Sequence, residues 1–154
     1  MRLARLLACA WLASLLAPST AAATPRDWTC QLTHVVDGDT IYARCGGERV
    51  KVRLLRIDTP EHDQPGFAEA GAALRALIGD QPIRLEFEKP GIPVTDEYGR
   101  WLVYVYAGGR NLNVEMVRQG WSRFWTKYGA GRLADDFRLA EREARDAKRG
   151  LWAH

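Results

Sequence analysis

The sequence has no internal repeat, no long linker and no block of charges of one sign. These absences exclude collagen-like, coiled-coil and low-complexity structures. The formal net charge is only +3 over 154 residues, so the overall charge does not identify a binding partner. With 47% hydrophobic and 27% charged residues, the chain suits one compact domain and leaves little room for two.

Long hydrophobic runs are also scarce, and the main one lies at the N-terminus. Its apolar part, residues 6–17, is shorter than the roughly 20 residues that a membrane-spanning helix needs. Two arginines precede it and a run of alanines follows it, which is the order of a secretory signal peptide. We predict that residues 1–23 are a signal peptide cleaved near Ala23, with an uncleaved anchor as the alternative. Residues 24–154 would then form a single, nearly neutral domain that is secreted or periplasmic.

Cysteine is rare, with three in the chain. Cys9 lies in the predicted signal peptide, so the mature chain keeps Cys30 and Cys45, too few for a four-ligand structural zinc site. Asp37-Gly38 predicts a hairpin turn, since Gly and to a lesser degree Asp tolerate the positive φ of such turns. If these two residues form the loop, paired positions add up to 75 and the two cysteines face each other. We predict a disulfide over two free thiols, although a bulge would shift this register.

The remaining pattern of apolar residues predicts three strands, a helix, two strands and two further helices. The expected strands are residues 28–36, 40–45, 50–57, 83–88 and 100–106, and the expected helices are residues 67–78, 112–119 and 132–148. This is the element order of an OB-fold, a mainly β fold of the α+β class. It has a five-stranded barrel, one helix between strands three and four, and here two C-terminal helices. An OB-fold suggests oligonucleotide or oligosaccharide binding by analogy only.

Four acidic residues lie in two turns that such a barrel can bring together. Asp37 and Asp39 are at the tip of the first hairpin, and Asp58 and Glu61 follow the third strand. Two aspartates and a backbone carbonyl suit a hard cation such as calcium, with water and substrate phosphate completing the shell. No His or Cys lies in the cluster to favour zinc or copper. The alternative is that each segment is only a turn or a strand end.

Two arginines supply the opposite charge. Arg53 lies inside an apolar strand, where an unpaired buried guanidinium would be costly, and Arg100 opens the fifth strand. A guanidinium matches phosphate in a bidentate way and stays charged at any working pH. A metal, two arginines and a carboxylate without a committed partner are the groups that phosphodiester cleavage needs. Alternatively, each arginine pairs with a neighbouring carboxylate or stays solvated.

Four ordered motifs together resemble the signatures of the staphylococcal-type thermonuclease family. They are VDGDT at 36–40, RLLRIDTPE at 53–61, DEYGR at 96–100 and VRQG at 117–120. The similarity runs from about residue 29 to residue 152. It implies an OB-fold, calcium-dependent phosphodiesterase that acts on DNA and RNA and leaves 3′-phosphate ends.

The resemblance also implies roles for single residues. Asp39 and Asp58 would bind calcium through their carboxylates, and Thr59 through its backbone carbonyl. The other implied roles are Glu61 as general base, Arg53 and Arg100 as phosphate ligands that stabilise the transition state, Asp37 as an acid beside the metal ligands, and Tyr98 and Tyr128 as substrate contacts.

Two positions depart from the family pattern. Glu97 stands where the best-known member has a lysine, and Thr126 where it has an aromatic residue, which concerns affinity and end preference more than chemistry. The predicted partners are single-stranded or locally open DNA and RNA. We expect a monomer, with no protein partner and no stable membrane association after signal cleavage. The alternative function is an OB-fold nucleic-acid-binding module with weak or no catalysis.

Overall fold

A computed structural model describes residues 28–153. The predicted signal peptide, its cleavage site and Cys9 lie outside the described residues. The elements in chain order are β1 (Trp28–Val35), β2 (Thr40–Cys45), β3 (Glu48–Leu54), β4 (Ile57–Asp58), α1 (Phe67–Ile78), β5 (Ile83–Phe87), β6 (Trp101–Ala107), β7 (Arg110–Asn111), α2 (Leu112–Arg118), β8 (Arg123–Phe124), α3 (Ala134–Asp146) and a 3-10 turn (Gly150–Trp152).

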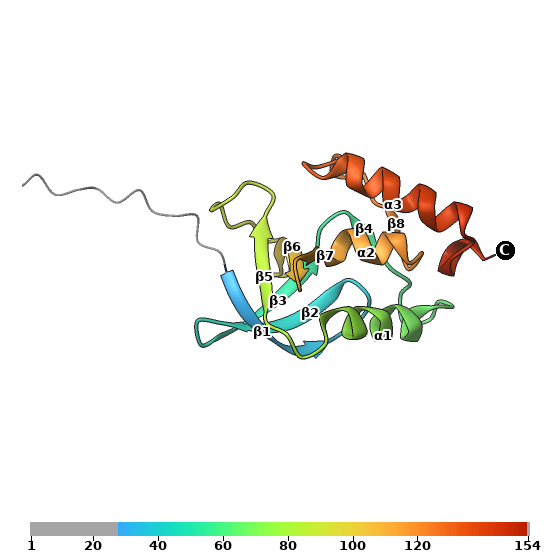
Figure 1. Cartoon of the computed structure of the whole chain (residues 1–154). Helices are drawn as coiled ribbons and strands as arrows, with labels where there is room; N and C mark the ends of the chain where they lie inside the picture. Colours follow the sequence, from blue (N-terminus) through green and yellow to red (C-terminus); the bar gives the residue numbers. More distant parts are fainter. Residues whose placement is uncertain (1–27, 154) are drawn as a thin grey trace, which may run out of the picture.

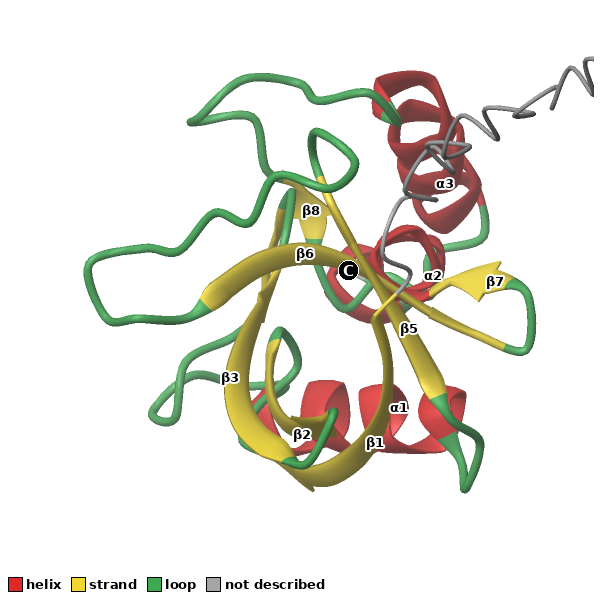
Figure 2. Ribbon diagram, turned by 90° about the vertical axis from the view of Figure 1, so that its left-hand side faces the viewer, coloured by secondary structure: helices red, strands yellow, loops and turns green. Residues whose placement is uncertain are grey.

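Five long strands form a closed barrel, which confirms the predicted OB-fold. Their order is β3-β2-β1-β5-β6, and β6 closes the ring by pairing in parallel with β3. Figure 2 shows the five strands curving around a common centre. Because the inward rows are apolar, Ile41, Val52 and Leu85 are each at most 1% exposed.

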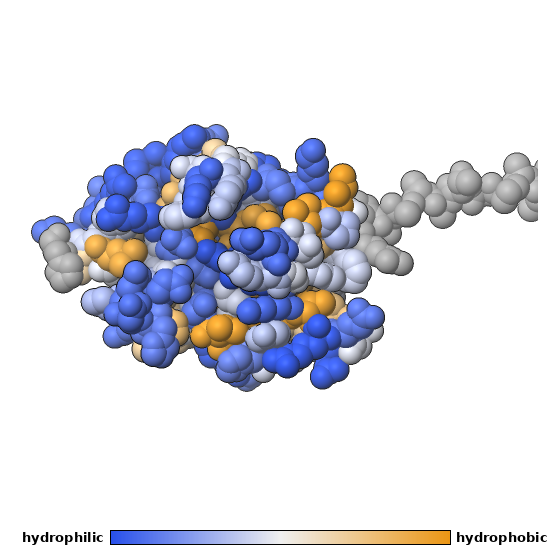
Figure 3. Space-filling model, turned by 180° about the vertical axis from the view of Figure 1, so that it is seen from behind, coloured by the Kyte–Doolittle hydropathy of each residue, from blue (hydrophilic) through white to orange (hydrophobic). Residues whose placement is uncertain are grey.

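The three predicted helices are present and cover different parts of the barrel. The helix between the third and fourth barrel strands, α1, lies on one side of the molecule, while α2 and α3 pack on each other (Figure 1). Phe124 of β8 stacks on Phe137 of α3 with the ring centroids 5.0 Å apart. Within residues 28–153, none of the helices has the length and apolar content of a membrane span. From the side opposite to Figure 1, the surface is largely hydrophilic with separate apolar areas (Figure 3).

The first hairpin reaches the predicted cysteine pairing by a different route. Near its tip, Val35 pairs with Ile41, so the loop is longer than two residues and paired positions add up to 76. A register shift between Leu32 and His34 then restores the predicted register. The two-residue loop was therefore wrong, and the bulge absorbs the extra residue before the cysteines are reached.

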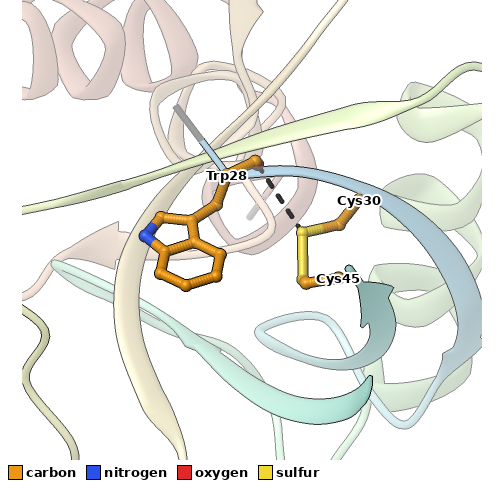
Figure 4. The surroundings of a disulfide bond; sticks show 3 residues. All are labelled: Trp28, Cys30 and Cys45. Atoms are coloured by element: carbon orange, nitrogen blue, oxygen red, sulfur yellow. Dashed lines mark hydrogen bonds between the residues drawn. A yellow bond between two sulfur atoms is a disulfide. The ribbon is translucent and has the colours of Figure 1, made fainter. Parts of the chain in front are cut away.

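The disulfide joins the base of this hairpin. Cys30 and Cys45 face each other across β1 and β2 with their Cα atoms 4.4 Å apart and are bonded. Both are buried, and Sγ of Cys30 lies 3.6 Å from the carbonyl oxygen of Trp28 (Figure 4). The bond clamps the strand pair whose other end carries Asp39.

Gly38 is needed for space and not for a positive φ, which corrects the predicted turn chemistry. Neither Asp37 nor Gly38 has a positive φ. A Cβ on Gly38 would lie 2.8 Å from the Cβ of Ala70 and 2.8 Å from the side chain of Thr59. The loop therefore packs against α1 and the segment after β4 so closely that any side chain would displace them.

The third strand ends earlier than predicted. Strand β3 stops at Leu54, and Arg56 adopts a φ of 65° that turns the chain into β4. Ile57 then pairs with Phe124 of β8. The apolar run through residues 50–57 hides this turn, because its cause is a set of contacts with residues far along the chain.

Candidate active site

A cleft of about 570 Å³ opens where the β1–β2 loop, the β3–β4 turn, the β5–β6 loop and the segment after β8 meet. All but one of the sequence-predicted catalytic, metal and substrate residues line it. They are Asp37, Asp39, Arg53, Asp58, Glu61, Tyr98, Arg100 and Tyr128. Thr59 does not line the cleft, but it contacts one of these residues directly. Segments up to 91 positions apart, from Asp37 to Tyr128, thus form one site.

Asp39 is the most buried carboxylate of the cleft, at 5% exposure. Its Oδ2 accepts hydrogen bonds from the backbone N–H of Thr59 at 2.9 Å and from the Thr59 hydroxyl at 3.0 Å. Its Oδ1 lies 3.1 Å from Nε of Arg53 and accepts from the hydroxyl of Thr40. Burial raises the pKa of Asp39 to about 6, with the charge of Arg53 opposing the rise.

Arg53 is fixed by four contacts. Besides Asp39, its Nη2 lies 3.1 Å from Oδ1 of Asp58. Its Nη1 donates to the carbonyl oxygens of Leu54 and Ile57, each at 2.9 Å. A guanidinium has five N–H donors, so one remains for a ligand. Arg53 therefore pairs with neighbouring carboxylates, as the alternative in the sequence analysis predicted, and these contacts fix its guanidinium in the cleft.

Arg100 is held at a single nitrogen of its guanidinium. Its Nε donates to Oδ2 of Asp96 at 2.6 Å. Asp96 also accepts from the backbone N–H groups of Tyr98 and Arg100, and Asp96 is a site residue that the sequence analysis did not single out. Although burial opposes it, these hydrogen bonds and the Arg100 charge lower the pKa of Asp96. The Nη atoms of Arg100 form no hydrogen bond or ion pair with the described residues, so they are available to an anion.

Glu61 lines the cleft as an exposed carboxylate. Its backbone N–H donates to the side chain of Gln64, and its own side chain has no partner among the described residues. The backbone of Asp58 is held by Ser122, whose hydroxyl donates to the Asp58 carbonyl and accepts from its N–H. The sequence gives no sign of Ser122, which is buried and lies 64 positions further along the chain.

The oxygen ligands around Asp39 and Asp58 suit a hard cation. No group of three or more His, Cys, Asp or Glu side chains in residues 28–153 is arranged to hold a metal ion. Two carboxylates, of Asp39 and Asp58, nevertheless meet at one guanidinium, with Asp37 and Glu61 lining the same cleft. One arginine beside four carboxylates leaves negative charge unbalanced. The residues therefore fit a partial oxygen shell that needs water and a phosphate to complete it.

The outer wall of the cleft is aromatic and exposed. Tyr98 and Tyr128 are 72% and 75% exposed, and the Tyr98 ring lies 5.3 Å from the guanidinium carbon of Arg100. Glu97 lines this wall, whereas Thr126 does not. Trp125 lines it instead, although no motif in the sequence marks this residue.

Comparison with known proteins gives a consistent set of relatives. A sequence model of the family described as staphylococcal nuclease homologue matches residues 51–154. Endonuclease YncB of Bacillus subtilis (strain 168) is 33% identical over 129 residues, which cover 79% of this chain and 60% of that protein. The SPbeta prophage-derived endonuclease YokF of the same strain is also 33% identical, over 79% of this chain and 43% of that protein.

A thermonuclease from Staphylococcus hyicus is 27% identical over 132 residues, covering 82% of this chain and 76% of that protein. The chain thus spans about half the length of the two endonucleases from Bacillus.

Proposed function

Since this chain belongs to the staphylococcal nuclease homologue family, we propose that it is an exported, calcium-dependent nuclease that hydrolyses DNA and RNA to 3′-phosphate-ended products. One observation carries the proposal. Two arginines and an uncommitted carboxylate, Glu61, line the same cleft as the paired aspartates Asp39 and Asp58. These are the groups that phosphodiester hydrolysis needs, and they come from four separate segments.

The arginines bind the scissile phosphate. Arg53 offers the one N–H that its four partners leave unused, while Arg100 offers both Nη atoms. Negative charge grows on the phosphate oxygens as a fifth oxygen approaches phosphorus. Donors already fixed in place stabilise that charge without reorganising.

Glu61 activates the water. Its carboxylate lines the cleft and has no partner among the described residues, so it accepts the proton of the attacking water as the new bond to phosphorus forms. The bond from phosphorus to the 5′ oxygen then breaks, leaving a 3′-phosphate, and the 5′ oxygen takes up a proton from solvent. Asp39, Asp58 and the Thr59 carbonyl would hold calcium, which neutralises charge on a phosphate oxygen when bound.

Export is proposed on two grounds. The predicted signal peptide has the order of a secretory leader. The buried Cys30–Cys45 bond suits an oxidising compartment, because cytosolic thiols are normally kept reduced. The substrates are proposed to be single-stranded or locally open, since two exposed tyrosines offer stacking surfaces beside the phosphate site.

The test is degradation of single-stranded DNA and RNA by the purified mature chain, with calcium or with a chelator. Glu61→Gln should lower turnover by about 100-fold or more, because it removes the proton acceptor and keeps the shape. Asp63→Asn is the matched control, since Asp63 is an exposed carboxylate of the same loop that does not line the cleft. It should keep full activity.

Three results separate the possibilities. Calcium-dependent cleavage that collapses only in Glu61→Gln supports the nuclease and the role of Glu61. Cleavage that survives in Glu61→Gln removes Glu61 as the base. Oligonucleotide binding without cleavage at any calcium concentration would assign the chain to the inactive binding modules.

A further inference from the structure

A basic surface leads away from the cleft along β3. In this strand, Val50, Val52 and Leu54 point into the barrel. Side chains alternate between the two faces of a strand, so the basic residues at positions 49, 51 and 53 form one row on the outside. The row begins at Arg53 in the cleft and ends at Arg49, roughly 13 Å away at the rise of a β-strand.

The neighbouring strands extend this row sideways. Tyr42 of β2 pairs with Lys51 and also with His34 of β1, and Arg44 pairs with Arg49. The guanidinium carbon of Arg49 lies 3.9 Å from the centre of the Tyr42 ring, and Nζ of Lys51 lies 5.7 Å from it. We call the surface formed by His34, Tyr42, Arg44, Arg49 and Lys51 the outer basic face.

The charge of this face is not neutralised within the described residues. Arg44, Arg49 and Lys51 form no ion pair there, whereas Arg53 in the same row contacts two carboxylates. Strands β2 and β3 contain one acidic residue, Glu48, which belongs to the opposite row. Arg44 donates to the carbonyl oxygen of Gly47 at 3.0 Å and Arg49 lies on the Tyr42 ring, so no carboxylate among the described residues neutralises either guanidinium.

We propose that the outer basic face is an extended subsite for the single strand of nucleic acid that passes through the cleft. Phosphates of the strand contact Lys51, Arg49 and Arg44, and one base takes the place of the Arg49 guanidinium on the Tyr42 ring when Arg49 moves to a phosphate. A positive track with an aromatic platform suits such a strand, and this side of an OB barrel is open to ligands. The proposal rests on the proposed function, because the strand it binds is the substrate of the cleft.

The test compares a short and a long ligand. Binding of labelled thymidine oligonucleotides of three and twelve nucleotides is measured in chelator, where no cleavage is expected. Removing three phosphate contacts in the triple variant Arg44→Gln/Arg49→Gln/Lys51→Gln should reduce the slope of log affinity against log salt by about 2 for the 12-mer. The 12-mer Kd should rise by about tenfold or more, and the trimer Kd should stay within about twofold.

A matched control has the same change in net charge. Arg110, Arg142 and Lys148 are exposed, without ion pairs among the described residues, and lie outside the cleft and the outer basic face. Replacing all three with Gln should leave both Kd values within about twofold. Tyr42→Ala should weaken 12-mer binding by about tenfold, because it removes both the stacking surface and the ring on which the Arg49 guanidinium lies. It also carries the test if the triple variant fails to fold.

The outcomes separate this proposal from the nuclease itself. If the triple variant loses affinity for the 12-mer but not for the trimer, and the wild type cleaves nothing with calcium, the subsite is supported and the nuclease is rejected. If the wild type cleaves normally but the triple variant loses equal affinity for the trimer and the 12-mer, the subsite alone is rejected. The same conclusion follows if the control variant loses as much affinity as the triple variant. If the triple variant no longer binds phosphatidylglycerol vesicles that the wild type binds, while its 12-mer affinity is unchanged, the outer basic face is a membrane contact and the proposed subsite is rejected.

Discussion

Arg53 and Arg100 line the same cleft, but the protein holds them in opposite ways. Arg53 commits four N–H donors to Asp39, Asp58 and two backbone carbonyls, whereas Arg100 commits only Nε, to Asp96. The wall around Arg53 is buried and contains Asp39, at 5% exposure, while the wall around Arg100 carries Tyr98, at 72%. The residues around Arg53 therefore belong to the folded core as well as to the site, whereas the residues around Arg100 mainly form a surface that contacts the ligand.

The largest expected effect comes from removing each arginine. Arg53→Ala and Arg100→Ala should each lower kcat by about 100- to 1,000-fold, because each removes a fixed donor to the transition state. Only Arg53→Ala should also lower the free energy of unfolding, by about 3 kcal/mol, since Asp39 is left buried without its cation. Turnover assays and urea denaturation measure the two effects separately.

Lysine at the same positions sharpens this contrast. Arg53→Lys should lose nearly as much activity as Arg53→Ala, because one ammonium cannot reach four acceptors and a phosphate. Arg100→Lys should keep more activity than Arg53→Lys, since it loses the two-nitrogen contact to phosphate but has only one protein hydrogen bond, to Asp96, to replace. Equal behaviour of the two lysine variants would contradict the difference between the walls.

The disulfide tests whether the buried wall depends on its hairpin. Replacing Cys30 and Cys45 with Ser should lower the free energy of unfolding by about 3 kcal/mol, the entropic contribution of a bond closing a loop of this length. The value of kcat should stay within about twofold, because the bond lies at the far end of the hairpin from Asp39. Denaturation of the wild type with and without reductant is the companion measurement. Two alkylatable thiols in the unreduced wild type would refute the bond.

The pH dependence of calcium binding tests the buried wall in a different way. Burial raises the pKa of Asp39 to about 6 in the metal-free protein, so a proton competes with calcium below that pH. The calcium affinity should fall by about tenfold per pH unit below about 6 and level off above it. Calorimetric titrations between about pH 5 and 7.5 measure this. Asp39→Asn should bind calcium weakly without that pH dependence, and an affinity unchanged at about pH 5 would remove Asp39 from the metal shell.

The smallest expected effect concerns the aromatic wall. Arg56 donates to the backbone carbonyls of Tyr128 and Gly129, both at 2.8 Å, and so fixes the segment that carries Tyr128. Arg56→Gln should raise KM by about fivefold or less, the order of one weakened stacking contact, with kcat nearly unchanged. Arg138→Gln, at an exposed ion pair on α3, is the control and should change neither. A large fall in kcat would show that Arg56 acts on the chemistry.

Local signals predicted most of the fold because they are read within a few residues. Helix α1 occupies the predicted residues 67–78, because its alanine and leucine run ends at Gly79. The end of β3 was wrong by three residues, because Arg56 turns the chain there. Its guanidinium reaches the segment at 128–129, more than seventy positions away. No periodicity within the strand could have shown this.

The candidate site divides in the same way. The charged residues stand in short motifs, so the order of residues along the chain was enough to indicate Asp39, Arg53, Glu61 and Arg100. Their supports do not stand in motifs. Ser122 reaches Asp58 across 64 positions, and Gly38 is required because Ala70 of α1 and Thr59 both lie 2.8 Å from where its Cβ would be.

The sequence by itself determined the order of the five barrel strands and three helices, the β-rich OB-fold class and the set of groups available for phosphate chemistry. These follow from residue types and short spacings, which are local properties of the chain. Tertiary structure alone decided which groups are committed and which are free. Arg53 became a fixed part of the buried wall, and Arg49 and Lys51 form no ion pair among the described residues in the same row of β3. The physical reason is burial: a buried cation must find its partners when the barrel closes, whereas an exposed one keeps water until a ligand replaces it.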